Sequence, residues 1–231
     1  MEIHGFQKTT LLDFPGHVAA TVFVGGCNFR CPFCHNGSLV LDPESHPPIA
    51  EEEVFAYLEK RRGVLEGVCI TGGEPTLQKD LTAFVRKLKD LGYLVKLDTN
   101  GYRPEVLKEL LAEELLDYVA MDVKASLANY DAATGISGLE QERILESIRL
   151  LKGCGIPYEF RTTVVKGIHG MEDIEEIGRM LQGCKAYYLQ GFRESDNMIG
   201  GGYEAFSIQE MEKMAEIAGK YIHRVKLRGV G

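Results

Sequence analysis

The sequence predicts an α/β fold, and three observations lead to it. Short apolar runs alternate with amphipathic segments along almost the whole chain. The apolar runs are rich in Val, Ile and Tyr and mostly lack strict alternation, as expected of buried parallel strands. Polar residues of types that can bind ligands or take part in catalysis come directly after several of these runs. Strands and helices in this order form parallel βα units with right-handed crossovers.

The apolar runs give the expected strands, which are short and rich in Val, Ile and Tyr. They are Val18–Val24, Val68–Thr71, Leu94–Asp98, Tyr118–Val123, Tyr158–Val165 and Ala186–Gln190, with Val225–Leu227 as an added edge strand. The expected helices have apolar residues at helical spacing: Glu51–Arg62, Lys79–Leu91, Pro104–Leu116, Gln141–Lys152, Met171–Leu181 and Ile208–Tyr221. Glycines mark several helix ends, and Pro104 suits a first helical turn. The segment Gly37–Pro48, with three prolines, is expected to be a loop.

Six βα units are too few for a closed eight-stranded barrel. Periodicity alone allows either an open, curved barrel or a flat doubly wound sheet. The polar residues favour the barrel, because they cluster beyond the carboxyl ends of strands, where barrels of this type place their sites. We therefore expect a partial (β/α)6 barrel forming a single domain over residues 1–231.

Composition and charge narrow the class of protein. The chain has 231 residues, 45% of them hydrophobic, and a formal net charge of −8. It has no basic block, so neither nucleic acid nor an anionic membrane is an expected partner. No apolar run approaches the roughly 18 residues that a membrane span needs. The N-terminus has no signal-like segment, and we expect a cytoplasmic protein with reduced thiols.

Three cysteines in eight residues are the most informative motif. Cys27, Cys31 and Cys34 lie on an expected loop, residues 25–36, that follows the first strand. Three thiolates can hold an iron–sulfur cluster and leave one iron without a protein ligand, and an open iron is a place for chemistry. Zinc is the main alternative, with His35 as a fourth ligand, although zinc ligands usually come from two separate knuckles. The other cysteines, Cys69, Cys154 and Cys184, are expected to be packing residues.

Polar residues follow the later strands in the same way. Gly72, Gly73 and Glu74 end the second strand, where two glycines allow close approach to the backbone. The third strand ends in Asp98, Thr99 and Asn100, and the fourth in Asp122 and Lys124. Arg161 lies within the fifth and Gln190 ends the sixth. Simpler roles remain open: Asp98 or Thr99 as a helix cap, an Asp122–Lys124 ion pair, and Arg161 paired with Glu159 or with an Asp of a neighbouring strand.

The cysteine spacing, with Phe33 before the third cysteine, resembles the radical S-adenosylmethionine enzymes when it is read together with Gly72-Gly73-Glu74-Pro75. The resemblance extends over nearly the whole chain. It implies a [4Fe-4S] cluster on the three cysteines, whose open iron is chelated by S-adenosylmethionine, and a role for residues 72–74 in receiving the methionyl amino group. Phe33, His35, Arg161 and Gln190 become candidate cofactor contacts, and oxygen sensitivity is expected.

Within that family the chain is most similar to the activating enzymes of glycyl-radical proteins. This resemblance implies that Asp98, Thr99 and Asn100 lie beside S-adenosylmethionine, and that Lys124 approaches its carboxylate. It makes Asp98 and Asp122 candidate ligands of a monovalent cation, Na⁺ or K⁺.

The same resemblance implies a reaction. S-adenosylmethionine is cleaved reductively to a 5′-deoxyadenosyl radical, which takes hydrogen from a glycine of a partner enzyme. The run Gly5–Gly16 together with Cys34-His35-Asn36 resembles the activators of anaerobic ribonucleoside-triphosphate reductase and pyruvate formate-lyase. A low-potential donor such as flavodoxin or ferredoxin is then required. Two alternatives remain: a radical enzyme acting on a small molecule, as deazaguanine-forming enzymes do, and a non-catalytic zinc or iron–sulfur module.

Overall fold

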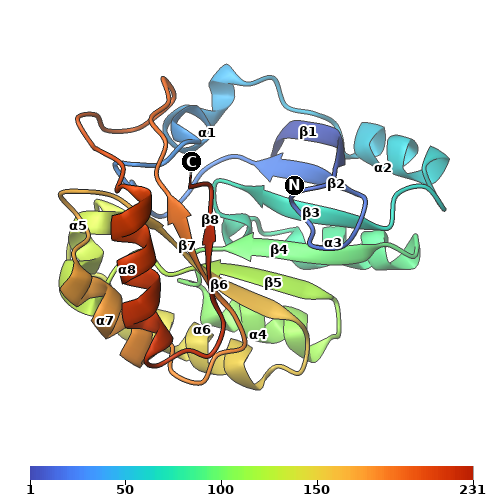
Figure 1. The fold of residues 1–231 in the computed structure, drawn as a ribbon. Coiled ribbons are helices and arrows are strands. Elements are labelled where there is room, and N and C mark those ends of the chain that lie inside the picture. Colours follow the sequence, from blue (N-terminus) through green and yellow to red (C-terminus); the bar gives the residue numbers. More distant parts are fainter. Residues whose placement is uncertain (231) are drawn as a thin grey trace. The chain divides into compact units, whose positions relative to one another are not determined.

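A computed structural model describes residues 1–230 of the chain (Figure 1). The strands are β1 (Ile3–Thr10), β2 (Ala19–Val24), β3 (Gly67–Gly72), β4 (Leu94–Thr99), β5 (Tyr118–Asp122), β6 (Tyr158–Val164), β7 (Tyr187–Gly191) and β8 (Val225–Arg228). The helices are α1 (Gly37–Leu41), α2 (Glu51–Lys60), α3 (Leu81–Asp90), α4 (Pro104–Ala112), α5 (Tyr130–Thr134), α6 (Gln141–Gly153), α7 (Met171–Met180) and α8 (Ile208–Gly219). Strand order in the sheet follows chain order.

The chain divides into two compact units, of which the first comprises residues 1–28, 38–99 and 105–119. Here β1 pairs antiparallel with β2, whereas β2–β3 and β3–β4 are parallel. Four consecutive residues, from Gly67 to Ile70 in β3, are buried, as the unbroken apolar run predicted. Helix α3 buries Leu81, Phe84, Val85 and Leu88, the residues that its helical spacing places on one face.

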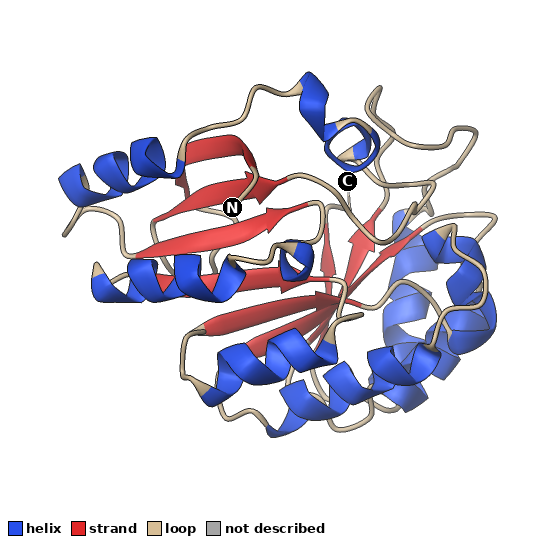
Figure 2. Cartoon of the chain, turned by 180° about the vertical axis from the view of Figure 1, so that it is seen from behind, coloured by secondary structure: helices blue, strands red, loops and turns tan. Residues whose placement is uncertain are grey.

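The second unit comprises residues 29–37 and 100–104 and the chain from residue 120 onward. Its strands β6, β7 and β8 are parallel neighbours. Helices α7 and α8 pack together, and α8 also contacts β7 and β8. Helix α8 begins with a capping box, in which Ser207 Oγ accepts from Glu210 N and Glu210 Oε2 accepts from Ser207 N. Figure 2 shows the longer helices, in blue, running alongside the red strands.

The expected parallel α/β arrangement is confirmed, and each expected strand and helix is present within a few residues of its predicted bounds. Three elements were not predicted. Strand β1 contains Gln7, Lys8 and Thr9, which are exposed, and a strand with little buried surface has little apolar pattern. The loop prediction for Gly37–Pro48 is wrong over α1, and α5 was also missed. The single-domain organisation stays a prediction.

Candidate functional site

In the first unit, the loops that follow β2 and β3 leave the sheet side by side, because Val24 and Gly72 are paired in register. Gly73 N donates to Val24 O at 2.8 Å, and Glu74 N donates to Gly26 O at 2.8 Å. A Cβ atom on Gly73 would overlap the carbonyl of Gly26. Glycine is thus required at Gly73 by contact with the start of the cysteine loop.

The Glu74 carboxylate is buried, with 1% of the residue exposed. Its Oε1 accepts from Thr76 N at 3.0 Å, Thr76 Oγ1 at 2.5 Å and Thr99 Oγ1 at 2.8 Å. These donors compensate the carboxylate for its loss of water. Glu74 and Thr99, both predicted cofactor contacts, are thereby brought together, and the side chains tie the loop after β3 to the end of β4.

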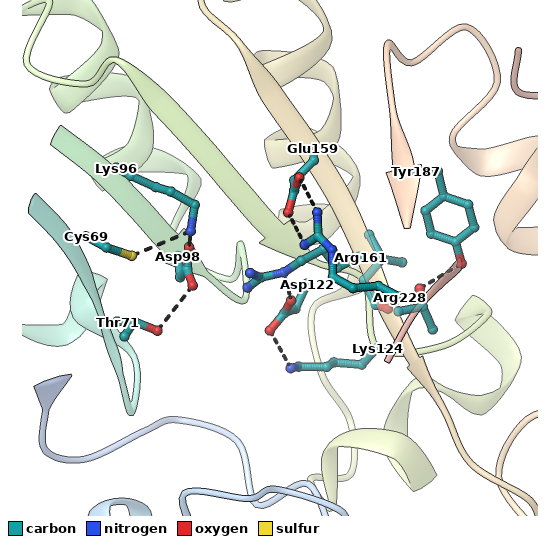
Figure 3. A network of polar contacts seen from close by, with 12 residues as sticks. Cys69, Thr71, Lys96, Asp98, Asp122, Lys124, Glu159, Arg161, Tyr187 and Arg228 are labelled. Carbon is teal, nitrogen blue, oxygen red and sulfur yellow. Dashed lines mark hydrogen bonds and ion pairs between the residues drawn. The ribbon is translucent and has the colours of Figure 1, made fainter. Parts of the chain in front are cut away.

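Asp98 lies at the end of β4 with a buried lysine beside it (Figure 3). Lys96 Nζ donates to Asp98 Oδ1 and lies 3.5 Å from Cys69 Sγ. Thr71 Oγ1 donates to Asp98 Oδ2 at 3.3 Å. Lys96 is 2% exposed. Sequence reasoning gave Lys96 no role, although the signal was the one used for Arg161: a charged residue inside an apolar strand.

In the second unit, the remainder of the cysteine loop is fixed by backbone hydrogen bonds. Cys34 N donates to Cys31 O at 3.0 Å, which closes a turn. Outside the turn, Arg30 N donates to Thr134 O at 2.7 Å, and Gly200 N donates to Pro32 O at 2.7 Å. The last residue of α5 and the loop after β7 therefore both hold this part of the loop.

Two predicted contacts of the cysteine loop face other segments of the second unit. His35 Nε2 lies 2.5 Å from Arg193 O, and its exposed ring stacks on Phe192. The ring of Phe33 is buried and meets the ring of His169 edge-on, with centroids 6.0 Å apart. Contacts of His35 and Phe33 with a cofactor stay predictions.

The chemistry of the cysteines fits a metal centre that takes thiolates. All six cysteines are free of disulfides. Burial raises the pKa of the Cys31 thiol to about 11, while the nearby Lys124 ammonium acts in the opposite direction. A thiol so buried ionises at neutral pH only when a strong positive charge, such as that of bound iron, replaces its proton. Within residues 1–230, neither unit taken by itself contains a group of three His, Cys, Asp or Glu side chains that could hold a metal ion. Cys27 belongs to the first unit, whereas Cys31 and Cys34 belong to the second.

Asp122 carries two cationic partners (Figure 3). Lys124 Nζ lies 3.0 Å from Asp122 Oδ2, and Arg161 Nε lies 2.8 Å from Asp122 Oδ1. Burial opposes ionisation of Asp122, but the two cations hold the pKa of this carboxyl well below its usual range. Burial likewise opposes the Lys124 ammonium, and Asp122 nevertheless raises the pKa of Lys124. The group carries a net positive charge.

The pairing of Arg161 settles one of the alternatives left open by the sequence. Arg161 pairs with Asp122 at the end of β5, an Asp of a neighbouring strand. Glu159 is 1% exposed and accepts two hydrogen bonds from Arg228, at 2.8 Å and 3.1 Å. Arg161 is therefore oriented toward the end of β5, where Lys124 also lies.

His169 is a residue that sequence reasoning assigned no role. It is 5% exposed, its Nδ1 accepts from Val165 N at 3.0 Å, and its Nε2 lies 2.7 Å from Lys124 O. Since Nδ1 is an acceptor, Nε2 carries the proton and donates to Lys124 O. Burial lowers the pKa of His169, which keeps the ring neutral. His169 thus fixes the backbone of residue 124, a contact between loops that no local sequence signal reveals.

Two further predicted cofactor contacts, Asn100 and Gln190, lie in the second unit. Asn100 is buried, and its Oδ1 accepts from Tyr102 N at 3.0 Å, so the side chain shapes the turn before α4. Gln190 lies in β7, in register with Thr163 and Arg228. Cofactor contacts for both stay predictions.

Among residues 1–230, no helix is long and apolar enough to cross a membrane.

The parallel α/β fold and the three-cysteine loop are those expected of radical S-adenosylmethionine enzymes, and comparison with known proteins identifies the family. The family model described as the radical SAM superfamily matches residues 21–181. A Methanocaldococcus jannaschii protein named "Putative glycyl-radical enzyme activating enzyme MJ1227" is 34% identical over 235 residues, covering 99% of this chain and 96% of its own length. The "Pyruvate formate-lyase 1-activating enzyme" of Escherichia coli K12 is 32% identical over 174 residues, covering 71% and 68% of the two chains.

The fold has solved counterparts. The crystal structure of Streptococcus suis SuiB superposes with a TM-score of 0.68 at 13% sequence identity, covering 91% of this chain and 49% of the SuiB chain. The chain belongs to the radical SAM superfamily and is a radical SAM enzyme. Membership implies a [4Fe-4S] cluster and S-adenosylmethionine as cofactors, and the alternative of a non-catalytic zinc or iron–sulfur module is thereby set aside.

Proposed function

We propose that this protein activates a glycyl-radical enzyme by removing a hydrogen atom from a backbone glycine of that partner. The observation that carries the proposal is the 34% identity, over 99% of this chain and 96% of the relative, with the protein named "Putative glycyl-radical enzyme activating enzyme MJ1227". The N-terminal run Gly5–Gly16 and the Cys-His-Asn sequence that closes the cysteine motif support anaerobic ribonucleoside-triphosphate reductase as the partner.

When bound, the cluster and S-adenosylmethionine supply one-electron cleavage and a radical able to abstract hydrogen. Cys27, Cys31 and Cys34 would hold the cluster. Lys124 and Arg161 bring two positive charges against the single negative charge of Asp122. This net charge favours the carboxylate of S-adenosylmethionine, which Lys124 would bind, since an ammonium has three donors and Asp122 engages only part of that capacity.

The remaining site residues are proposed to orient and enclose S-adenosylmethionine. Gly72, Gly73 and Glu74 would receive the methionyl amino group through backbone atoms, because the Glu74 carboxylate accepts from Thr76 and Thr99.

We also propose that residues 1–231 form one domain and that flavodoxin or ferredoxin is the electron donor. A cytoplasmic location is proposed as well, and the six unbridged cysteines support it.

The test is electron paramagnetic resonance of a reconstituted anaerobic mixture. Reduced protein, S-adenosylmethionine and the candidate reductase should give a doublet borne by the reductase, together with 5′-deoxyadenosine. A reductase with its radical-site glycine changed to alanine is the matched control and should give no doublet.

Two outcomes would contradict the proposal. Absence of the doublet with every glycyl-radical protein encoded beside this gene would count against activation. Turnover of a small molecule without any protein partner would replace it with the small-molecule alternative.

A further inference from the structure

Lys96 is a buried cation for which the proposed reaction has no use. It lies in β4, in register with Cys69 of β3, and is 2% exposed. Its ammonium contacts Asp98 Oδ1, with Cys69 Sγ at 3.5 Å (Figure 3). A buried charge persists only when it is paired, and a strand interior readily accepts an apolar residue in place of a lysine. The charge of Lys96 therefore calls for an explanation beyond packing.

The explanation begins with Asp98, which was predicted to hold Na⁺ or K⁺. Both of its carboxylate oxygens have partners within the first unit: Lys96 Nζ at Oδ1 and Thr71 Oγ1, at 3.3 Å, at Oδ2. The negative charge of Asp98 is already balanced by a side chain of the same strand. An alkali cation at this carboxylate would be repelled by the ammonium that contacts it.

The second predicted cation ligand, Asp122, shows the same pattern within its own unit. Lys124 and Arg161 occupy its two oxygens, at 3.0 Å and 2.8 Å. Cation sites rely on oxygen ligands that bring uncompensated negative charge. Neither carboxylate offers that charge, so the donor set does not fit the predicted alkali cation.

We propose that the Lys96 ammonium is the built-in cation of this site. It supplies at Asp98 the positive charge that a dissolved alkali ion would otherwise bring, and cofactor binding therefore has no Na⁺ or K⁺ requirement. The inference rests on the proposed place of Asp98 beside S-adenosylmethionine, but not on the identity of the protein partner.

The experiment removes the ammonium and asks whether an alkali ion takes its place. Lys96→Met keeps an unbranched side chain, shorter by the ammonium group, and deletes the charge. S-adenosylmethionine affinity is measured by equilibrium dialysis on cluster-loaded protein, at equal ionic strength, in NaCl, KCl and tetramethylammonium chloride. Wild-type affinity should be the same in all three salts. The variant should bind about tenfold more weakly in tetramethylammonium, the effect of roughly one lost unit of 1.36 kcal/mol, and recover in Na⁺ or K⁺.

A second measurement needs neither cluster nor cofactor. Na⁺ or K⁺ should raise the thermal unfolding midpoint of metal-free Lys96→Met relative to tetramethylammonium, because Asp98 without its ammonium can take the alkali ion. Lys89→Met is the matched control, since Lys89 Nζ pairs with Asp117 Oδ2 at 2.7 Å in the same unit and both side chains are 28% exposed. It should show no preference among the three salts.

Two results would overturn the proposal. One is wild-type binding that already requires Na⁺ or K⁺, which can be measured even if the variant does not fold. The other is a folded Lys96→Met protein that behaves alike in all three salts, which would make Lys96–Asp98 a purely structural pair. Neither result depends on whether a glycyl radical forms, so failure of the proposed function is recognised separately.

Discussion

Lys124 gives the sharpest test of the proposed cofactor site. We consider Lys124→Met, which removes the ammonium and retains an unbranched side chain. Asp122 keeps Arg161, whose Nε lies 2.8 Å from Oδ1, so the carboxylate is not left unpaired. Because Lys124 and Asp122 are 19% and 30% exposed, the loss of their mutual attraction is moderated by solvent, and the fold should survive.

The expected magnitude follows from the bond that is lost. One charge-assisted hydrogen bond to the carboxylate of S-adenosylmethionine contributes about 1.5–3 kcal/mol. At 1.36 kcal/mol for each factor of ten, binding should weaken by roughly 10- to 150-fold. Iron and acid-labile sulfide should remain at wild-type levels, because no proposed cluster ligand is changed.

The assay is equilibrium dialysis of S-adenosylmethionine against anaerobic, cluster-loaded protein. Lys166→Met is the matched control: Lys166 Nζ pairs with Glu210 at 3.1 Å in the second unit, on side chains that are 36% and 37% exposed. It should leave affinity unchanged. Wild-type affinity in Lys124→Met would refute the assignment of Lys124 to the cofactor carboxylate.

Three further variants separate structural from chemical roles. Cys31→Ala should abolish both the cluster, measured as iron and sulfide, and all cleavage of S-adenosylmethionine; a retained cluster would exclude Cys31 as a ligand. Cys184→Ser should leave activity near the wild-type level and lower stability by about 1–3 kcal/mol, since a hydroxyl replaces a thiol that is 5% exposed; lost activity in folded protein would refute a packing role. For His169, burial lowers the pKa in the folded state, so below about pH 6.5 the unfolded chain binds a proton that the fold rejects, and stability should fall as pH falls. Urea unfolding between about pH 5 and 7.5 should show a flatter profile for His169→Gln than for wild type, and identical profiles would contradict the assignment.

The sequence predicted the elements that are buried and regular. Strand β3 is recognisable because four consecutive residues are buried, which produces an unbroken apolar run. Strand β1 is half polar, and α1 and α5 have five residues each, which is too short for helical periodicity to be distinctive. The limits of prediction were therefore physical: weak burial leaves a weak pattern.

For the candidate site, too, some features could be predicted from the sequence and others could not. Motif residues such as Cys31 and Lys124 could be named from spacing and family resemblance. The partners of these residues could not, because partnership is a matter of distance across strands. The pairing of Arg161 with Asp122 was one of two alternatives, and the contact of His169 with Lys124 O, at 2.7 Å, joins residues 45 positions apart.

The pairings bear on how an acidic chain can bind an anionic centre. The protein carries a formal net charge of −8, yet Asp122 faces two cations within its unit, and the Lys124 ammonium also acts on Cys31 and Cys34. In the proposed site, the thiolates of Cys31 and Cys34 and a cofactor carboxylate would add negative charge within this unit, and an excess of resident cations would lower the cost of gathering it. Within the first unit, Lys96 balances the charge of Asp98 in the same way. In the proposed site, the local excess of positive charge beside Asp122 would therefore matter more for anion binding than the net charge of the whole chain.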